Sequence, residues 1–153
     1  MLQTEKAKIL LVDDDRNICD TLSLILESRG HDVDVAHTGK AALEKSKTKA
    51  YDLAVLDVRL PDIEGTKLLR TMHETRPRMV KIMLTGYYPE TQKAIDAIKN
   101  GAEAYFTKPV NLVHLIEAIE DRLEELKEPK TNTEETRVPY ANASAEDASE
   151  ATE

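Results

Sequence analysis

The sequence predicts an α/β fold in which five parallel strands alternate with five helices and form one covered sheet. Two observations predict this fold. Short apolar runs of strand length recur along the chain, and segments with apolar residues at helical spacing separate them. The most apolar of these runs are nearly continuous, which is typical of parallel strands that are buried on both faces. Such alternation implies helices on both sides of the sheet.

The five predicted strands differ in how buried they should be. The first reads KILLV and the third LAVL, which favours central positions in the sheet. The second reads DVDVA, and this alternation is typical of a half-exposed edge strand. In chain order, the predicted strands lie at residues 8–12, 32–36, 53–56, 80–84 and 103–107.

Capping residues and glycines support the helices between these strands. Thr38 and Asn111 can cap the second and fifth helices, and Gly30 and Gly101 can stop the first and fourth. Pro61 and Gly65 bracket a loop before the third helix, and the last helix has an apolar face that runs to Leu126. Helices are predicted at residues 40–46 and 91–100, and around apolar residues within 18–26, 68–72 and 112–126.

The order of the strands follows from the handedness of their connections. Right-handed crossovers leave few topologies, and the flavodoxin-like (βα)5 order 2-1-3-4-5 is the common one for a chain of 153 residues. The first and third strands are then neighbours at the point where the strand order reverses. Ligands bind in the crevice at the carboxyl edge there.

Composition excludes several classes of protein. The net charge of −8 argues against direct binding to nucleic acid, which needs a basic surface. No apolar stretch approaches the roughly 20 residues that a membrane span requires. The single cysteine, Cys19, cannot form an internal disulfide bond, which favours the reducing cytoplasm. We therefore expect a cytoplasmic protein.

The composition changes after the last predicted helix, near residue 128. Residues 128–153 hold seven acids and two bases, and Val138 and Tyr140 are their only large apolar residues. Such a segment cannot bury enough apolar surface to offset the entropy of ordering. We expect a folded domain at 1–127 and an acidic, disordered tail at 128–153.

Polar residues follow the predicted strands at the points where they end. Asp13 and Asp14 follow the first strand, Asp57 the third, Thr85 the fourth and Lys108 the fifth. The carboxyl ends of parallel strands share one edge, so these residues should lie together. Clustered carboxylates repel one another, and this repulsion favours a bound cation. Carboxylate oxygens with no nearby Cys or His favour Mg²⁺ or Ca²⁺, and a small number of protein ligands favours Mg²⁺.

The same residues also fit a carboxylate nucleophile. Asp57 could form an aspartyl-phosphate while Lys108 and the metal offset the incoming charge. Taken alone, each residue also has a simpler structural interpretation. The aspartates at 13–15 could be a solvated loop with one member capping the next helix, and Thr85 could be a turn residue. Only the joint placement of these residues at strand ends favours the site.

At these residues the chain resembles the receiver domains of two-component response regulators. The resemblance spans about residues 7–127. ILLVDDD is similar to the acidic pair, with Asp14 as the principal metal ligand and Asp13 as its helper. YDLAVLDVRLPDIEG is similar to the phosphoacceptor segment, with Asp57 as acceptor and the main-chain carbonyl of Arg59 as a metal ligand.

Two further segments carry the rest of the resemblance. MLTGY holds the hydroxyl residue Thr85, and GAEAYFTKP holds the switch aromatic Tyr105 and the lysine Lys108. The resemblance implies that Thr85 moves toward the bound phosphoryl group and that Tyr105 packs into the vacated space. It also implies a cis peptide bond between Lys108 and Pro109, which X-Pro sequences can adopt.

The resemblance implies partners as well as chemistry. The phosphoryl donor would be a sensor histidine kinase or a histidine phosphotransfer protein, and phosphorylation would shift the balance between two conformers. With no folded segment expected after the last helix, the chain resembles the stand-alone, single-domain type. A downstream protein would then read the face built from the fourth helix, fifth strand and fifth helix. Receivers of this kind also form phosphorylation-dependent homodimers.

Two positions bear on turnover. Arg59 and Tyr87 are bulky and occupy positions that tune phosphate lifetime in the family, which predicts slow self-dephosphorylation.

A phosphatase of the haloacid-dehalogenase type would need an aspartate where Arg59 stands, and arginine cannot donate a proton. A phosphate-independent binding domain on this scaffold is a third hypothesis, but such domains usually lack the acidic pair, the acceptor or the lysine. We therefore expect a signalling module and not a turnover enzyme.

Overall fold

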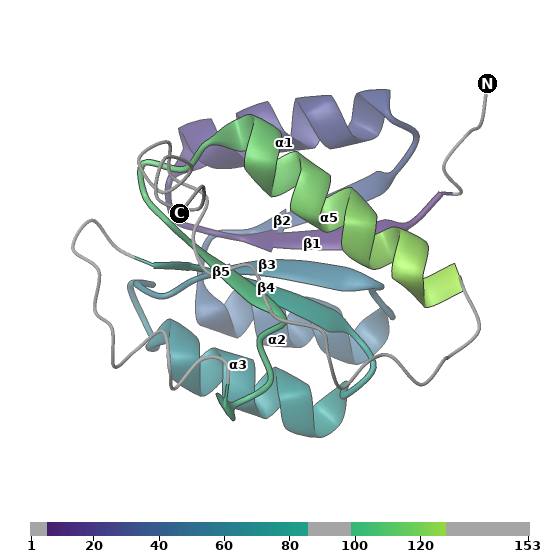
Figure 1. The fold of residues 1–153 in the computed structure, drawn as a ribbon. Helices are drawn as coiled ribbons and strands as arrows, with labels where there is room; N and C mark the ends of the chain where they lie inside the picture. The colour runs from purple at the N-terminus through teal and green to yellow at the C-terminus, as the bar shows by residue number, and fades with distance from the viewer. Residues whose placement is uncertain (1–5, 86–98, 128–153) are drawn as a thin grey trace, which may run out of the picture.

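The computed structural model describes residues 6–85 and 99–127 of the chain. Five parallel strands form one sheet in the order β2-β1-β3-β4-β5, as predicted (Figure 1). The strands, in chain order, are β1 at Lys8–Val12, β2 at Asp32–Ala36, β3 at Leu53–Asp57, β4 at Val80–Thr85 and β5 at Ala104–Thr107. Each predicted strand agrees with the observed one to within one residue at either end.

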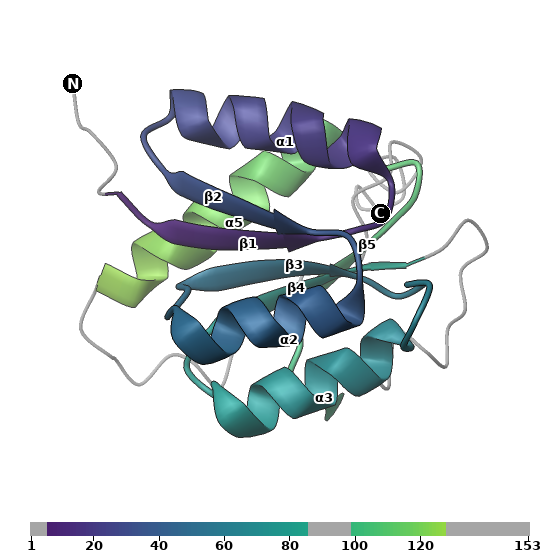
Figure 2. The ribbon, with the colours of Figure 1, turned by 180° about the vertical axis from the view of Figure 1, so that it is seen from behind.

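The helices form one layer on each face of the sheet. α1 at Arg16–Ser28 and α5 at Leu112–Lys127 cover one face, and α2 at Gly39–Thr48 and α3 at Gly65–Thr75 cover the other (Figures 1 and 2). Each layer encloses a separate apolar core. The core under α1 and α5 contains Ile9 and Phe106, and the core under α2 and α3 contains Leu10 and Met83. The sheet is therefore buried on both sides, as its apolar strands require.

Two predictions for the helices need comment. The fourth predicted helix, at 91–100, falls almost wholly outside the described residues, as does the tail at 128–153. The last helix forms as predicted, but Leu126 is 48% exposed and does not extend its apolar face into the core. Leu126 lies in the final turn of α5. No helix in the described ranges is long and apolar enough to cross a membrane.

The predicted helix ends are present. The side chain of Thr38 accepts a hydrogen bond from the Ala41 amide at 3.0 Å, and Asn111 accepts one from the His114 amide at 3.2 Å. Gly30 has a φ of 98° and follows α1, as expected of a glycine that ends a helix. These contacts are local, which is why the sequence alone predicts them.

A long-range cap was not predicted. The Asp62 carboxylate accepts hydrogen bonds from the amides of Gly39 at 2.8 Å and Lys40 at 2.9 Å, in the first turn of α2. These amide donors hold the pKa of the Asp62 carboxyl below its usual value. The contact ties the loop after β3 to the start of α2, across 23 residues of sequence. It therefore helps to place the loop that follows Asp57.

The strand register aligns the carboxyl edge. Val12 pairs with both Ala36 and Leu56, so Asp13 and Asp57 follow at the same level of neighbouring strands. Thr85, the last residue of β4, pairs with Thr107, which places Lys108 at the same edge. The residues singled out from the sequence therefore begin at one end of the sheet.

Candidate functional site

Asp13, Asp57 and Lys108 meet at the carboxyl edge of the sheet. The Lys108 ammonium lies 3.2 Å from Asp57 Oδ2, to which it donates a hydrogen bond, and 3.0 Å from Asp13 Oδ2. Asp13 and Asp57 are buried, with 2% and 3% of their surfaces exposed. The peptide bond between Lys108 and Pro109 is cis, as predicted. One ammonium group thus contacts two buried carboxylates from different strands.

Asp14 completes a cluster of three carboxylates. Carboxylate oxygens of Asp13, Asp14 and Asp57 all lie within 4.8 Å of one another, and Asp14 is exposed. Asp15 takes no part in this cluster and caps α1, where its side chain accepts hydrogen bonds from the Asn17 and Ile18 amides. Of the three consecutive aspartates, Asp13 and Asp14 therefore belong to the cluster, and Asp15 caps the start of α1.

Burial and charge make the ionised state of Asp57 unfavourable. Loss of water and the neighbouring Asp13 carboxylate raise the pKa of Asp57 from 3.8 to about 6, although Lys108 and the Arg59 amide oppose the rise. Burial alone would lower the pKa of Lys108, but the two carboxylates outweigh it and raise that pKa. The cluster holds more negative charge than Lys108 neutralises.

The donor set fits a hard divalent cation. Three carboxylates supply closely spaced oxygens, and Asp14 is open to solvent. Asp13 Oδ2 is buried and shares the Lys108 ammonium, 3.0 Å away, with Asp57 Oδ2. One ammonium between two buried carboxylates leaves oxygen lone pairs that a divalent cation can fill. Oxygen ligands with room for water favour Mg²⁺.

Comparisons with known proteins agree with this geometry. The family model for the response regulator receiver domain matches residues 9–120. The chain belongs to the response regulator receiver domain family.

The solved structures and curated proteins that are similar to the chain agree with this family assignment. A CheY-like receiver domain protein from Methanospirillum hungatei JF-1 is 42% identical, with a TM-score of 0.75 over 79% of this chain and 96% of that one. The transcriptional regulatory protein ZraR of Escherichia coli K12 is 32% identical over 115 residues, which are 75% of this chain and 26% of that protein. The regulatory protein VanRc of Enterococcus gallinarum is 36% identical over 116 residues, 76% of this chain and 49% of that protein. The receiver domain thus spans about a quarter to a half of these two curated relatives.

Of the remaining predicted site residues, the structure describes Arg59 and Tyr105 and the backbone of Thr85. Arg59 is exposed, and its amide donates to Asp57 Oδ1 at 3.2 Å, so the chain turns back over the carboxylate. Thr85 is the last residue of β4, and its side chain is outside the described part of the structure. Tyr105 lies on β5, is half-buried and packs against the core under α2 and α3. Tyr87 also lies outside the described residues.

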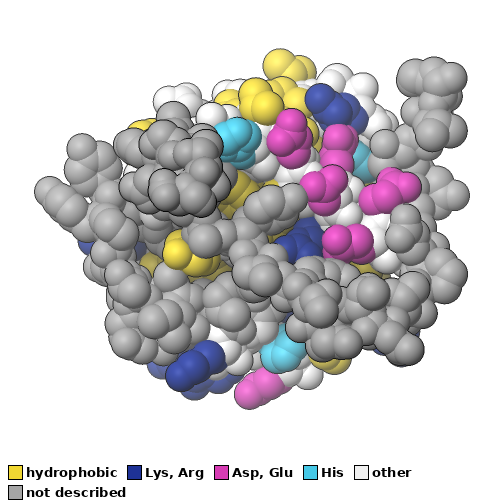
Figure 3. All heavy atoms as spheres, viewed as in Figure 1, with side chains coloured by type: hydrophobic (Ala, Val, Ile, Leu, Met, Phe, Trp, Pro, Cys, Tyr) yellow, Lys and Arg dark blue, Asp and Glu magenta, His cyan; other side chains and the backbone are white. Residues whose placement is uncertain are grey.

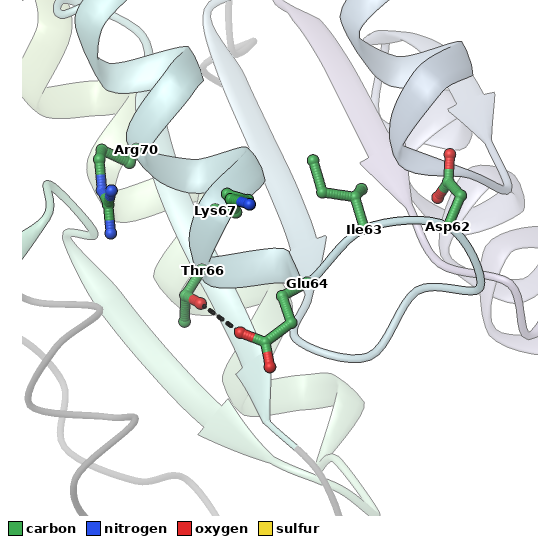
Figure 4. Close-up of a pocket in the computed structure, with 6 residues that line it drawn as sticks. All are labelled: Asp62, Ile63, Glu64, Thr66, Lys67 and Arg70. Carbon is green, nitrogen blue, oxygen red and sulfur yellow. Dashed lines mark hydrogen bonds between the residues drawn. The ribbon is translucent and has the colours of Figure 1, made fainter.

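A separate open pocket of about 360 Å³ lies beside the first turns of α3 (Figure 4). Its lining contains none of the residues predicted for the receiver site. Thr66 donates a hydrogen bond to Glu64 at 3.3 Å across its rim, and the side chains around it are of both charges. The lining residues are Asp62, Ile63, Glu64, Thr66, Lys67 and Arg70.

The sequence did not reveal two contacts that hold the receiver site. His37 Nδ1 lies 2.9 Å from the main-chain oxygen of Asp13, and Cys19 Sγ donates to the same oxygen at 3.4 Å. Burial and the nearby Asp13 raise the pKa of Cys19 to about 12, so its thiol keeps the proton that it donates. No spacing rule connects these residues with Asp13, because the contacts depend on how β2 and α1 pack beside β1.

Gly65 allows the receiver domain to pack α3 directly against Asp57. A Cβ atom at Gly65 would overlap the main-chain oxygen of Asp57 and lie 2.6 Å from the Cα of Val58. The Gly65 amide donates to the Val58 oxygen at 2.7 Å, so the two backbones are in contact. Glycine is therefore required by close approach of the chain.

Replacing Gly65 with alanine should destabilise the receiver domain by about 1–3 kcal/mol, because the backbone of β3 cannot yield as a side chain would. Urea unfolding of the metal-free protein measures this loss. Thr66→Ala is the matched control, since it adds no atoms to the interface and removes a hydrogen bond to the exposed carboxylate of Glu64. Equal unfolding midpoints for the two variants would contradict the packing argument.

Proposed function

We propose that this receiver domain takes a phosphoryl group onto Asp57 in a Mg²⁺ site, in the cytoplasm, and passes the signal on by protein contact. The observation that carries this proposal is the contact of the Lys108 ammonium with Asp57 and Asp13, 3.2 and 3.0 Å away, inside a group of three carboxylates. The donor would be a sensor histidine kinase or a histidine phosphotransfer protein. The domain proper would comprise residues 1–127, followed by an acidic tail at 128–153.

The residues divide the chemistry among them. An oxygen of Asp57 attacks phosphorus, and the bond between phosphorus and the donor nitrogen breaks, with its electron pair going to that nitrogen. Lys108 can follow the charge as it moves from the carboxylate to the phosphoryl oxygens, because it already contacts Asp57 Oδ2. Its contact with Asp13 holds the ammonium at the site throughout. Thr85, at the end of β4, would donate its hydroxyl to a phosphoryl oxygen.

The metal would be held by four groups. These are the carboxylates of Asp13, Asp14 and Asp57 and the main-chain carbonyl of Arg59. When bound, Mg²⁺ offsets the negative charge of the carboxylates and of the arriving phosphoryl group. The excess negative charge that raises the pKa of Asp57 supports this arrangement.

The output would pass through Tyr105 and the neighbouring face of the domain. Tyr105 is half-buried against the core, so a shift of Thr85 toward phosphate would leave it space to pack inward. Acidic side chains gather over α5 on the face shown in Figure 3, where Glu117, Asp121 and Glu124 are exposed. A downstream protein that reads α5, or a second phosphorylated copy, would have to match this charge.

The experiment is incubation with Mg²⁺ and acetyl phosphate, followed by intact-protein mass spectrometry. We expect one phosphoryl adduct per chain, and none when EDTA removes the metal. No adduct with Mg²⁺ present would contradict the proposed function. Steady release of phosphate over many turnovers would favour a phosphatase instead. The bulk of Arg59 and Tyr87 should keep the adduct for longer than minutes after the donor is removed, and decay within seconds would contradict that expectation.

A further inference from the structure

Three groups hold the main chain of Asp13 from outside the carboxylate cluster. The Asp13 amide donates to the Ala36 oxygen at 3.1 Å, at the end of β2. The Asp13 oxygen lies 2.9 Å from His37 Nδ1, and Cys19 Sγ donates to it at 3.4 Å. His37, the residue that directly follows β2, is thus the one whose side chain meets Asp13.

The chemistry of this contact determines the state of the imidazole. A main-chain oxygen can only accept a hydrogen bond, so His37 Nδ1 must carry a proton and donate it. The bond is 2.9 Å long and joins the residue after β2 to the loop after β1, across 24 residues of sequence. His37 therefore holds the Asp13 oxygen from the end of a neighbouring strand.

Fixing that oxygen also constrains the next residue. The peptide group is planar, so the oxygen of Asp13 and the amide of Asp14 lie in one plane, and holding the first orients the second. Asp13 Oδ1 in turn accepts a hydrogen bond from the Asp15 amide at 2.9 Å, which turns the side chain back over the same loop. The two carboxylates of the acidic pair thus project from Cα atoms that lie in one peptide plane.

We propose that His37 is a positioning residue for the metal site: its Nδ1–H bond to the Asp13 oxygen sets the Asp13–Asp14 peptide plane and so aims both carboxylates at the ion. This inference rests on the proposed Mg²⁺ site and adds a residue to it. His37 is not among the groups proposed to hold the ion or the phosphoryl group. It would affect how well the carboxylate oxygens of Asp13 and Asp14 are placed before the metal binds.

Two substitutions separate the hydrogen bond from the shape of the side chain. In His37→Asn the amide nitrogen stands as many bonds from the main chain as Nδ1, so it can donate to the same oxygen. His37→Leu fills similar space and has no donor. Thr38→Ala is the stability control, because it removes the cap of α2 in the same loop and leaves the Asp13 oxygen untouched.

Calorimetric titration with Mg²⁺ alone, without a phosphoryl donor, tests the proposal. We expect His37→Leu to bind Mg²⁺ about tenfold more weakly than the wild type, and His37→Asn and Thr38→Ala to stay within about twofold. Wild-type affinity in His37→Leu would overturn the role of His37, and so would an equal loss in His37→Asn. A wild-type protein that binds no Mg²⁺ would instead contradict the proposed function.

A measurement on the unaltered protein gives a second test without any variant. Nitrogen-15 NMR of the imidazole distinguishes a proton on Nδ1 from one on Nε2. We expect His37 of the EDTA-treated wild type to carry its proton on Nδ1. A neutral ring protonated only on Nε2 would overturn the proposal, because such a ring cannot donate to the Asp13 oxygen.

Discussion

An Asp57→Asn variant should take up no phosphoryl group from acetyl phosphate in Mg²⁺, while the wild type gains one. An amide lacks the anionic oxygen that attacks phosphorus, and Asp57 is the carboxylate that Lys108 already contacts by hydrogen bond. Intact-protein mass spectrometry measures the adduct. Asp14→Asn is the matched comparison, since it removes a carboxylate from the cluster but leaves the acceptor. A full adduct on Asp57→Asn would show that another residue is the acceptor.

The Asp57→Asn variant should be more stable than the wild type when metal is absent. The pKa of Asp57 rises from 3.8 to about 6 on folding, because burial and Asp13 disfavour its charge. Between these two values the folded state binds more protons than the unfolded one, so stability falls as pH rises. At 1.36 kcal/mol per pKa unit, the free energy of unfolding of the wild type falls by roughly 3 kcal/mol, and this fall is complete above about pH 6.

Urea unfolding in EDTA at several pH values measures this difference. We expect Asp57→Asn to exceed the wild type by up to that amount at pH 7, and the gap to close near pH 4, where the wild-type carboxyl is protonated. Mg²⁺ should raise the stability of the wild type at pH 7 more than that of the variant. A variant less stable than the wild type at pH 7 in EDTA would contradict the charge repulsion inferred from the cluster.

Replacing Lys108 with methionine should slow phosphoryl uptake by about 100- to 1,000-fold, as does loss of one positioned charge or donor at other transfer sites. The ammonium lies within 3.2 Å of both buried carboxylates, so it is placed to follow the charge as it moves. Binding of Mg²⁺ should tighten, because a competing cation has been removed. The rate of adduct formation and a Mg²⁺ titration measure the two opposite effects.

Lys81→Met is the control for Lys108→Met. Lys81 is also buried, but it lies near the start of β4, where its ammonium donates to the Arg76 oxygen at 2.9 Å. Its loss should lower stability and leave both the rate of uptake and Mg²⁺ affinity unchanged. Slowing of uptake by Lys81→Met to the same extent would mean that Lys108 acts only through stability.

The elements, and the polar residues that follow them, can be predicted from local patterns in the chain. Apolar runs predict the five strands, and the polar residues at their carboxyl ends are Asp13, Asp14, Asp57, Thr85 and Lys108. These inferences succeed because strand period, capping and crossover handedness are local or general properties of the chain. Thr38 and Asn111 cap their helices for the same reason.

How these residues act on one another depends on the packing of the chain. The sequence left open which member of the aspartate triplet caps the next helix; Asp15 caps the start of α1 by local hydrogen bonds, whereas the contact of Asp13 with Lys108 needs the strands to pack. Two further contacts join segments more than 20 residues apart in sequence. Asp62 binds an amide at the start of α2, and His37 contacts the main-chain oxygen of Asp13. The pKa of Asp57 depends on burial and on a charge from another strand. Distances between such segments arise only when the strands pair, so no local pattern encodes them.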